Sequence, residues 1–184
     1  MEIKINTEQI LKVLYVFSWI IFIGVCVEAG SFIVSTILTL VFNQMETQYF
    51  WHEVDLSNLY AHDSGYFFVV SLIMIVVAIL RAYLFYLIVK ILHGNKLNMA
   101  QPFNHEIRRF IFKLSYISLL IGMFSLWGVK NAEWLVKQGI QMPDIQYLRL
   151  GGADVWLFMS VTIFVIAQIY KRGIEIQEEN ELTV

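Results

Sequence analysis

The sequence predicts an all-α membrane protein in which four transmembrane helices form a bundle. The chain has 184 residues, of which 58% are hydrophobic and only 15% are charged. Soluble domains are about 45–50% apolar and about 25% charged, and a chain this short has too little interior to bury the excess. In addition, four apolar stretches approach the roughly 20 residues that a helix needs to cross the hydrocarbon core. A bilayer is therefore the expected solvent.

The four stretches occur in order along a single membrane domain, residues 1–184. The predicted spans run about 13–42, 66–89, 110–132 and 153–172. The first contains Glu28 as its single charge, and the second contains Arg81 as its single charge. The first stretch is longer than a bilayer requires, so we expect this helix to tilt or to project from the membrane.

The third and fourth spans have recognisable end signals. Asn104 is a favourable N-cap for the third helix, because its side chain can accept a hydrogen bond from a first-turn N–H. Gly173 follows Lys171 and Arg172 and is expected to end the fourth helix. Residues 173–184 then form a polar, acidic tail.

Lysine and arginine are distributed unequally between the two ends of the predicted bundle. One end has nine: Lys4, Lys12, Lys90, Lys96, Arg108, Arg109, Lys113, Lys171 and Arg172. The other end has three: Lys130, Lys137 and Arg149. Because positively charged connections stay on the cytoplasmic side, both termini are predicted to be cytoplasmic.

Polar residues within the spans are candidate functional residues. Ionisable groups inside a membrane are costly and usually face protein or a water-filled cavity. Glu28 shares a helical stripe with Gly24, Ser31 and Ser35. A second stripe on the third span consists of Ser115, Ser118, Gly122 and Ser125. Small and hydroxyl residues allow close helix contact, so we expect the two stripes to meet or to line a shared polar cavity.

Two arrangements of the intramembrane charges remain open. Glu28 and Arg81 can pair directly only if Lys12 projects beyond the membrane surface. If Lys12 lies at the surface, Glu28 is deeper in the membrane than Arg81. In the alternative, Arg81 snorkels toward the surface and a neutral Glu28 bonds to a serine hydroxyl. A neutral carboxyl in the membrane would also suit a proton-coupled carrier.

The sequence offers little for a metal, a cofactor or catalysis. The connection between the first two spans contains His52, Glu53, Asp55, His62 and Asp63, but their spacing matches no zinc motif, so a solvated acidic loop is expected. All four histidines lie outside the spans, which disfavours a haem. We find no nucleotide-binding or catalytic motif, so neither a cofactor nor an enzyme is predicted. The net charge of −2 gives no basic field for direct nucleic-acid binding.

Two segments carry a family resemblance. The ending RGIEIQEENELTV and the connection QPFNHEIRRF resemble the bacterial domain-of-unknown-function family 2975. The resemblance implies a multi-pass protein of the bacterial cytoplasmic (inner) membrane with no established catalytic residues. Members are often encoded beside a small Cro-like helix-turn-helix regulator, which implies a cytoplasmic transcription regulator as a partner.

Three functions are compatible with these features. The leading prediction is a non-enzymatic regulatory or interaction protein that acts through its cytoplasmic face. The residues assigned to that face are Arg108, Arg109, Glu178, Glu179, Leu182 and Val184. The alternative is a small proton-coupled carrier or ligand-binding membrane protein that uses Glu28, and an enzyme acting on a membrane-borne substrate ranks third. The lipid bilayer is a predicted partner, and assembly into a homo-oligomer is left open.

Overall fold

The computed structural model describes residues 7–42, 54–93 and 104–181, and every structural statement below concerns these residues. The helices are α1 (Thr7–Phe42), α2 (Ser57–His62), α3 (Ser64–His93), α4 (His105–Lys137) and α5 (Ala153–Glu181). Four of them, α1, α3, α4 and α5, are long and apolar enough to cross a membrane. The prediction of an all-α protein with four membrane-spanning helices is confirmed. The short helix α2 was not predicted.

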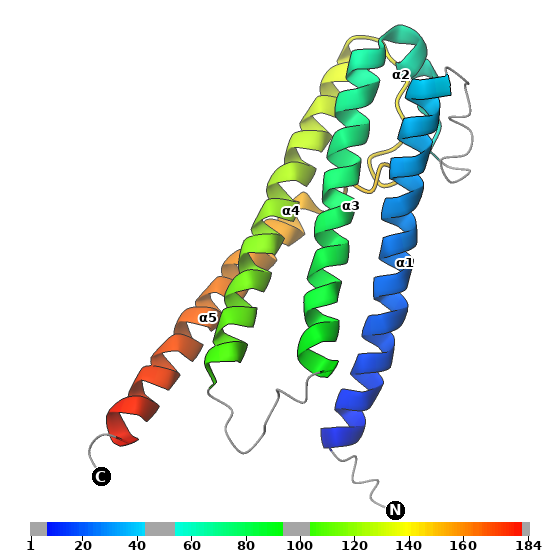
Figure 1. The fold of residues 1–184 in the computed structure, drawn as a ribbon. Coiled ribbons are helices and arrows are strands. Elements are labelled where there is room, and N and C mark those ends of the chain that lie inside the picture. The colour runs from blue at the N-terminus through cyan, green and yellow to red at the C-terminus, as the bar shows by residue number, and fades with distance from the viewer. Residues whose placement is uncertain (1–6, 43–53, 94–103, 182–184) are drawn as a thin grey trace, which may run out of the picture.

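The four long helices follow one another across the molecule in the order α1, α3, α4, α5 (Figure 1). Helix α1 packs against α3, α3 against α4, and α4 against α5. The first residues of α1 and α4 and the last residues of α3 and α5 lie at the same end (Figure 1), which we call the terminal end. The opposite end, where α2 lies, is called the far end.

The two connections that leave the far end are closely packed. Four of their leucines, Leu56, Leu59, Leu148 and Leu150, are no more than 1% exposed. The first two come from the segment around α2, and the other two come from the connection 138–152. Asn58 Nδ2 donates to Gln141 Oε1 at 3.3 Å and so links these two segments. The far-end connections therefore fold onto the helices and belong to the core.

Short polar side chains begin two of the long helices. Asp63 Oδ1 accepts from the backbone N–H groups of Gly65 and Tyr66, at 2.6 and 3.0 Å, and so caps α3. Asn104 Oδ1 accepts from the Glu106 N–H at 2.6 Å, which confirms the predicted N-cap of α4. Each cap satisfies an N–H group that has no partner within the helix.

The predicted helix stop at Gly173 is wrong, because α5 continues to Glu181. Its buried residues recur at every seventh position: Ala153, Ser160, Ala167 and Ile174. A seven-residue repeat keeps one face of a helix against its neighbour. Ile174 extends that contact past Gly173, and packing offsets the roughly 1 kcal/mol that an internal glycine costs. Leu182 and Val184 lie outside the described residues.

Candidate functional site

The serine stripe of α4 packs against α5. Ser115 Oγ donates to the Ser160 carbonyl at 3.0 Å, and Gly122 faces the side chain of Leu157. The expectation that this stripe meets the Glu28 stripe is therefore wrong, because α3 lies between α1 and α4 (Figure 1). The seven-residue spacing of small residues in the fourth span is the sequence signal that would have identified α5 as the partner.

The residues of the Glu28 stripe differ in how far they are buried. Ser31 and Ser35 are half-buried, whereas Gly24 is exposed. Ser118, on α4, is only 1% exposed. The Glu28 side chain is 20% exposed and points to a partner that the sequence did not suggest.

That partner is Arg149, from the connection 138–152. Arg149 Nε lies 3.2 Å from Glu28 Oε1, and the arginine side chain is 55% exposed. The pair is an ion pair without a well-aligned hydrogen bond, because the carboxylate oxygen has no hydrogen-bond partner among the described residues. The prediction that Arg149 is a far-end cation is wrong, because its side chain pairs with Glu28 in the membrane-spanning part of the protein.

Arg81 belongs to the same group of charges, although Glu28 forms its ion pair with Arg149. The Arg81 guanidinium lies over the Trp156 ring, 5.8 Å from its centroid, and is within electrostatic range of both Glu28 and Arg149. Its Nε is buried and has no hydrogen-bond partner among the described residues. We call Glu28, Arg81, Arg149 and Trp156 the charged cluster. It draws on α1, α3, α5 and the connection 138–152.

The charged cluster lies deep within the membrane-spanning part. Arg81 lies 12 residues before His93, the last residue of α3, which corresponds to about 18 Å of helix. Tyr15 Oη is 2.7 Å from His93 Nδ1, so Lys12 lies beyond the end of α3. This offset brings Glu28 and Arg81 to a similar depth and removes the mismatch expected from the sequence.

A tight turn positions Arg149. The Arg149 N–H bonds to the Gln146 carbonyl at 3.1 Å, and the Leu150 N–H bonds to the Ile145 carbonyl at 3.3 Å. The end of α4 has the same pattern, in which Gly139 takes the left-handed conformation with φ +85°. Arg149 occupies the equivalent position with φ 57°. Glycine is the residue usually found there, so an arginine at this position is strained.

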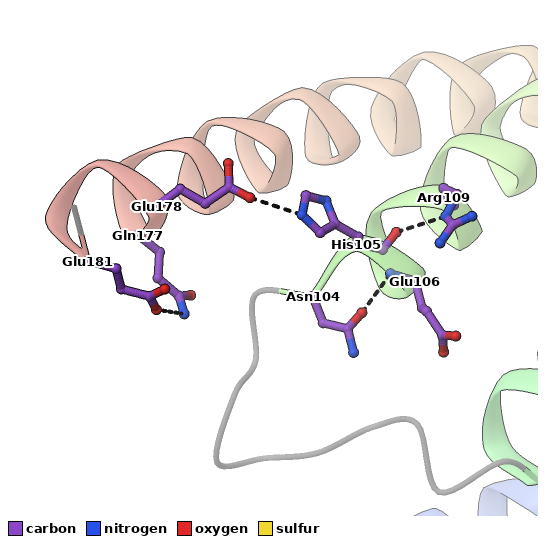
Figure 2. A network of polar contacts seen from close by, with 7 residues as sticks. All are labelled: Asn104, His105, Glu106, Arg109, Gln177, Glu178 and Glu181. Atoms are coloured by element: carbon purple, nitrogen blue, oxygen red, sulfur yellow. Dashed lines mark hydrogen bonds and ion pairs between the residues drawn. The ribbon is translucent and has the colours of Figure 1, made fainter.

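At the terminal end, a polar contact between His105 and Glu178 joins α4 and α5. His105 Nε2 lies 2.9 Å from Glu178 Oε1, and the two side chains point toward each other (Figure 2). Arg109 Nε donates to the His105 carbonyl at 3.4 Å (Figure 2). The start of α4 is thus fixed against the last turns of α5.

Other acids of the predicted tail pair within α5. Arg172 Nη1 lies 3.0 Å from Glu175 and 3.6 Å from Glu179. Two of the residues predicted for the interacting face, Glu178 and Glu179, lie on α5, which continues to Glu181. Arg108 and Arg109 lie near the start of α4.

Two of the carboxylates considered for a metal site, Asp55 and Asp63, have backbone partners. Asp63 caps α3, and Asp55 Oδ1 accepts from the Ser57 N–H at 2.9 Å. Hydrogen bonds from the hydroxyl and the N–H of Ser57 hold the pKa of Asp55 below its ordinary value. No group of three or more metal-binding side chains occurs within the described ranges, while His52 and Glu53 lie outside them.

Comparison with known proteins identifies the family but no close relative. No curated protein and no solved structure matches the chain. The profile of a family described as "Protein of unknown function (DUF2975)" matches residues 51–184. This region includes Arg81, Arg149, Trp156 and the terminal end of α4 and α5, whereas Glu28 precedes it. Since the match covers more than half of the chain, the protein belongs to the DUF2975 family.

Proposed function

We propose that this protein is a non-enzymatic membrane-anchored interaction protein whose terminal end lies in the cytoplasm. Its partner would be a soluble cytoplasmic protein, with a helix-turn-helix transcription regulator as the first candidate. The excess of lysine and arginine at the terminal end supports the orientation.

The supporting observation is the helical extension of α5 after Arg172. Ile174 is 3% exposed and holds the extension in place, while Ile176 is 46% exposed on its surface. Acidic side chains surround this isoleucine along the helix: Glu175, Glu178, Glu179 and Glu181. An ordered helix that presents an apolar residue among charges can bind a groove on a partner. Its order lowers the entropy cost of binding.

The test uses two matched isoleucines on α5. Ile176 and Ile169 are seven residues apart and so lie on the same face, but Ile169 lies before the Lys171–Arg172 step, within the membrane-spanning part. Ile176→Ala should reduce recruitment of a purified helix-turn-helix regulator to isolated membranes, by about tenfold if Ile176 is an anchor of the interface. Ile169→Ala should leave recruitment unchanged. Equal recruitment by the wild type and by Ile176→Ala would contradict the proposal.

A second candidate function is a small proton-coupled carrier or ligand-binding protein that uses Glu28. It is supported by the depth of the charged cluster, since ionisable groups at such depth often mark transport pathways. Cells that express the protein would then lose ethidium faster than control cells, and Glu28→Gln should abolish the difference. Unchanged efflux with Glu28→Gln would rule out a mechanism based on this carboxylate.

A further inference from the structure

A groove on the surface of α4 and α5 lies at the terminal end. Its volume is about 450 Å³. The residues that line it are Arg108, Arg109, Phe112, Lys113, Tyr116 and Lys171. Four of these six residues are cationic and none is acidic. A smaller groove of about 220 Å³ on the α3 side of α4 shares Arg109 and Lys113 with it, and its lining adds Lys90 and one acid, Glu106.

The positive charge of the larger groove is only partly neutralised by protein. Lys171 Nζ lies 3.8 Å from Glu175 Oε1, but Glu175 also binds Arg172, at 3.0 Å. Within the described residues, neither Arg108 nor Lys113 forms a salt bridge. The bond from Arg109 Nε to the His105 carbonyl uses one of the five N–H donors of its guanidinium. The groove therefore favours an anionic ligand.

Next to these cations, toward the middle of the membrane-spanning part, three aromatic rings form a cluster. The ring centroids of Phe112 and Tyr116 are 6.4 Å apart, and Phe164 of α5 lies 5.8 Å from Phe112 and 6.3 Å from Tyr116. Tyr116 is 54% exposed and Phe164 is 36% exposed, so both can contact lipid. Cations thus lie at the headgroup side and aromatic rings at the hydrocarbon side of one surface.

We propose that this groove binds an anionic phospholipid. The phosphate would contact Arg108, Lys113 and Lys171, and an acyl chain would lie against Tyr116 and Phe164. Basic pockets between transmembrane helices commonly bind such headgroups. A soluble phosphate compound would satisfy the cations, but it would leave the aromatic cluster unused. The arrangement of the two surfaces therefore favours a lipid over a free phosphate.

The test compares lipid binding to the full-length protein in a neutral detergent by native mass spectrometry. Phosphatidylglycerol and phosphatidylcholine with identical acyl chains are the probes, and glycerol 3-phosphate represents a free phosphate. The wild type should bind phosphatidylglycerol in clear preference to phosphatidylcholine. Arg108→Gln with Lys113→Gln should weaken phosphatidylglycerol binding about tenfold or more.

The control removes two charges from the other end of α4. Lys130→Gln with Lys137→Gln should leave phosphatidylglycerol binding unchanged, because both lysines lie far from the groove. Tyr116→Ala should weaken binding of the lipid. Equal loss in the two double variants would show general charge attraction and overturn the proposal. Equal affinity for glycerol 3-phosphate would identify a free phosphate site. Equal binding of the two lipids by the wild type would refute the proposal without any variant.

Discussion

At the scale of single residues, Arg149 combines an unfavourable backbone with a favourable side-chain contact. A left-handed conformation costs a non-glycine residue about 1–2 kcal/mol. Its side chain compensates by pairing with Glu28 at 3.2 Å in a region where an unpaired carboxylate is costly. The ion pair thereby holds the connection 138–152 against α1, a helix whose main packing partner is α3.

Arg149→Gly separates the backbone effect from the charge effect. Glycine relieves the strain, but the variant leaves Glu28 without its partner, so we expect the free energy of unfolding to fall by about 1–3 kcal/mol. Arg149→Gly combined with Glu28→Gln should recover part of that loss, because the unpaired carboxylate is removed while the Arg81 guanidinium stays in the cluster without a carboxylate. Denaturant unfolding in micelles provides the double-mutant cycle. Strictly additive effects would show that the two side chains are not coupled.

Asp55 offers a prediction outside the membrane-spanning helices. Its folded-state pKa is lowered by the Ser57 hydroxyl and N–H. The contribution of Asp55 to stability is therefore present above the ordinary pKa of aspartate and is lost as the pH falls through the lowered value. Ser57→Ala removes the hydroxyl and should raise the pKa of Asp55, as measured by NMR titration of the carboxyl carbon. An unchanged titration would show that the hydroxyl plays no part.

At the scale of helices, close approach between α4 and α5 depends on small residues. A Cβ added at Gly122 would lie 2.8 Å from Leu157 Cγ and 3.1 Å from its backbone nitrogen. The Leu157 side chain could change its rotamer, but relieving the contact with its backbone nitrogen requires α5 to move away from α4. A Cβ at Gly24 or Gly30 of α1 would meet nothing within 4 Å. These glycines therefore form a matched set on helices of the same protein.

We expect opposite effects from alanine at these glycines. Gly122→Ala should lower the free energy of unfolding by about 1–3 kcal/mol, because overpacking displaces α5. Gly24→Ala should be neutral or should raise it by up to about 1 kcal/mol, since alanine is the better helix former. Thermal unfolding in the same detergent compares the two variants. A similar response at both positions would contradict the small-residue packing described for α4 and α5.

The helices could be predicted because length and apolarity are local properties of the sequence. Packing partners could not, since a stripe such as Ser115 to Ser125 shows which face is buried but not which helix covers it. The end of α5 was mispredicted for the same reason. Glycine at position 173 is a local stop signal, and the contact made by Ile174 overrides it.

At the scale of the whole molecule, the two ends of the bundle differ in construction. The far end is closed by α2 and the connection 138–152, with leucines that are almost completely buried. The terminal end has the cationic grooves and the acidic helical extension. The four spans and their order could be predicted from the sequence, as could the placement of the start of α1 and the end of α5 at the same end of the bundle. The contact between Arg149 and Glu28 could not be predicted, because it depends on a turn in the connection 138–152 that packs against residues distant in the sequence.

The orientation of this asymmetric molecule in the membrane provides the last prediction. Because Arg149 lies in the charged cluster, Lys130 and Lys137 are the predicted cations that remain at the far end. The excess of lysine and arginine at the terminal end is therefore larger than the sequence suggested, which favours a cytoplasmic terminal end. Single cysteines at Ala61 in α2 and Glu181 in α5, both exposed, can be introduced after Cys26→Ala removes the natural thiol. In intact cells, a membrane-impermeant maleimide should label Ala61→Cys, and it should label Glu181→Cys only after the membrane is permeabilised. The reverse pattern would place the acidic extension outside the cell, and a cytoplasmic partner would then be impossible.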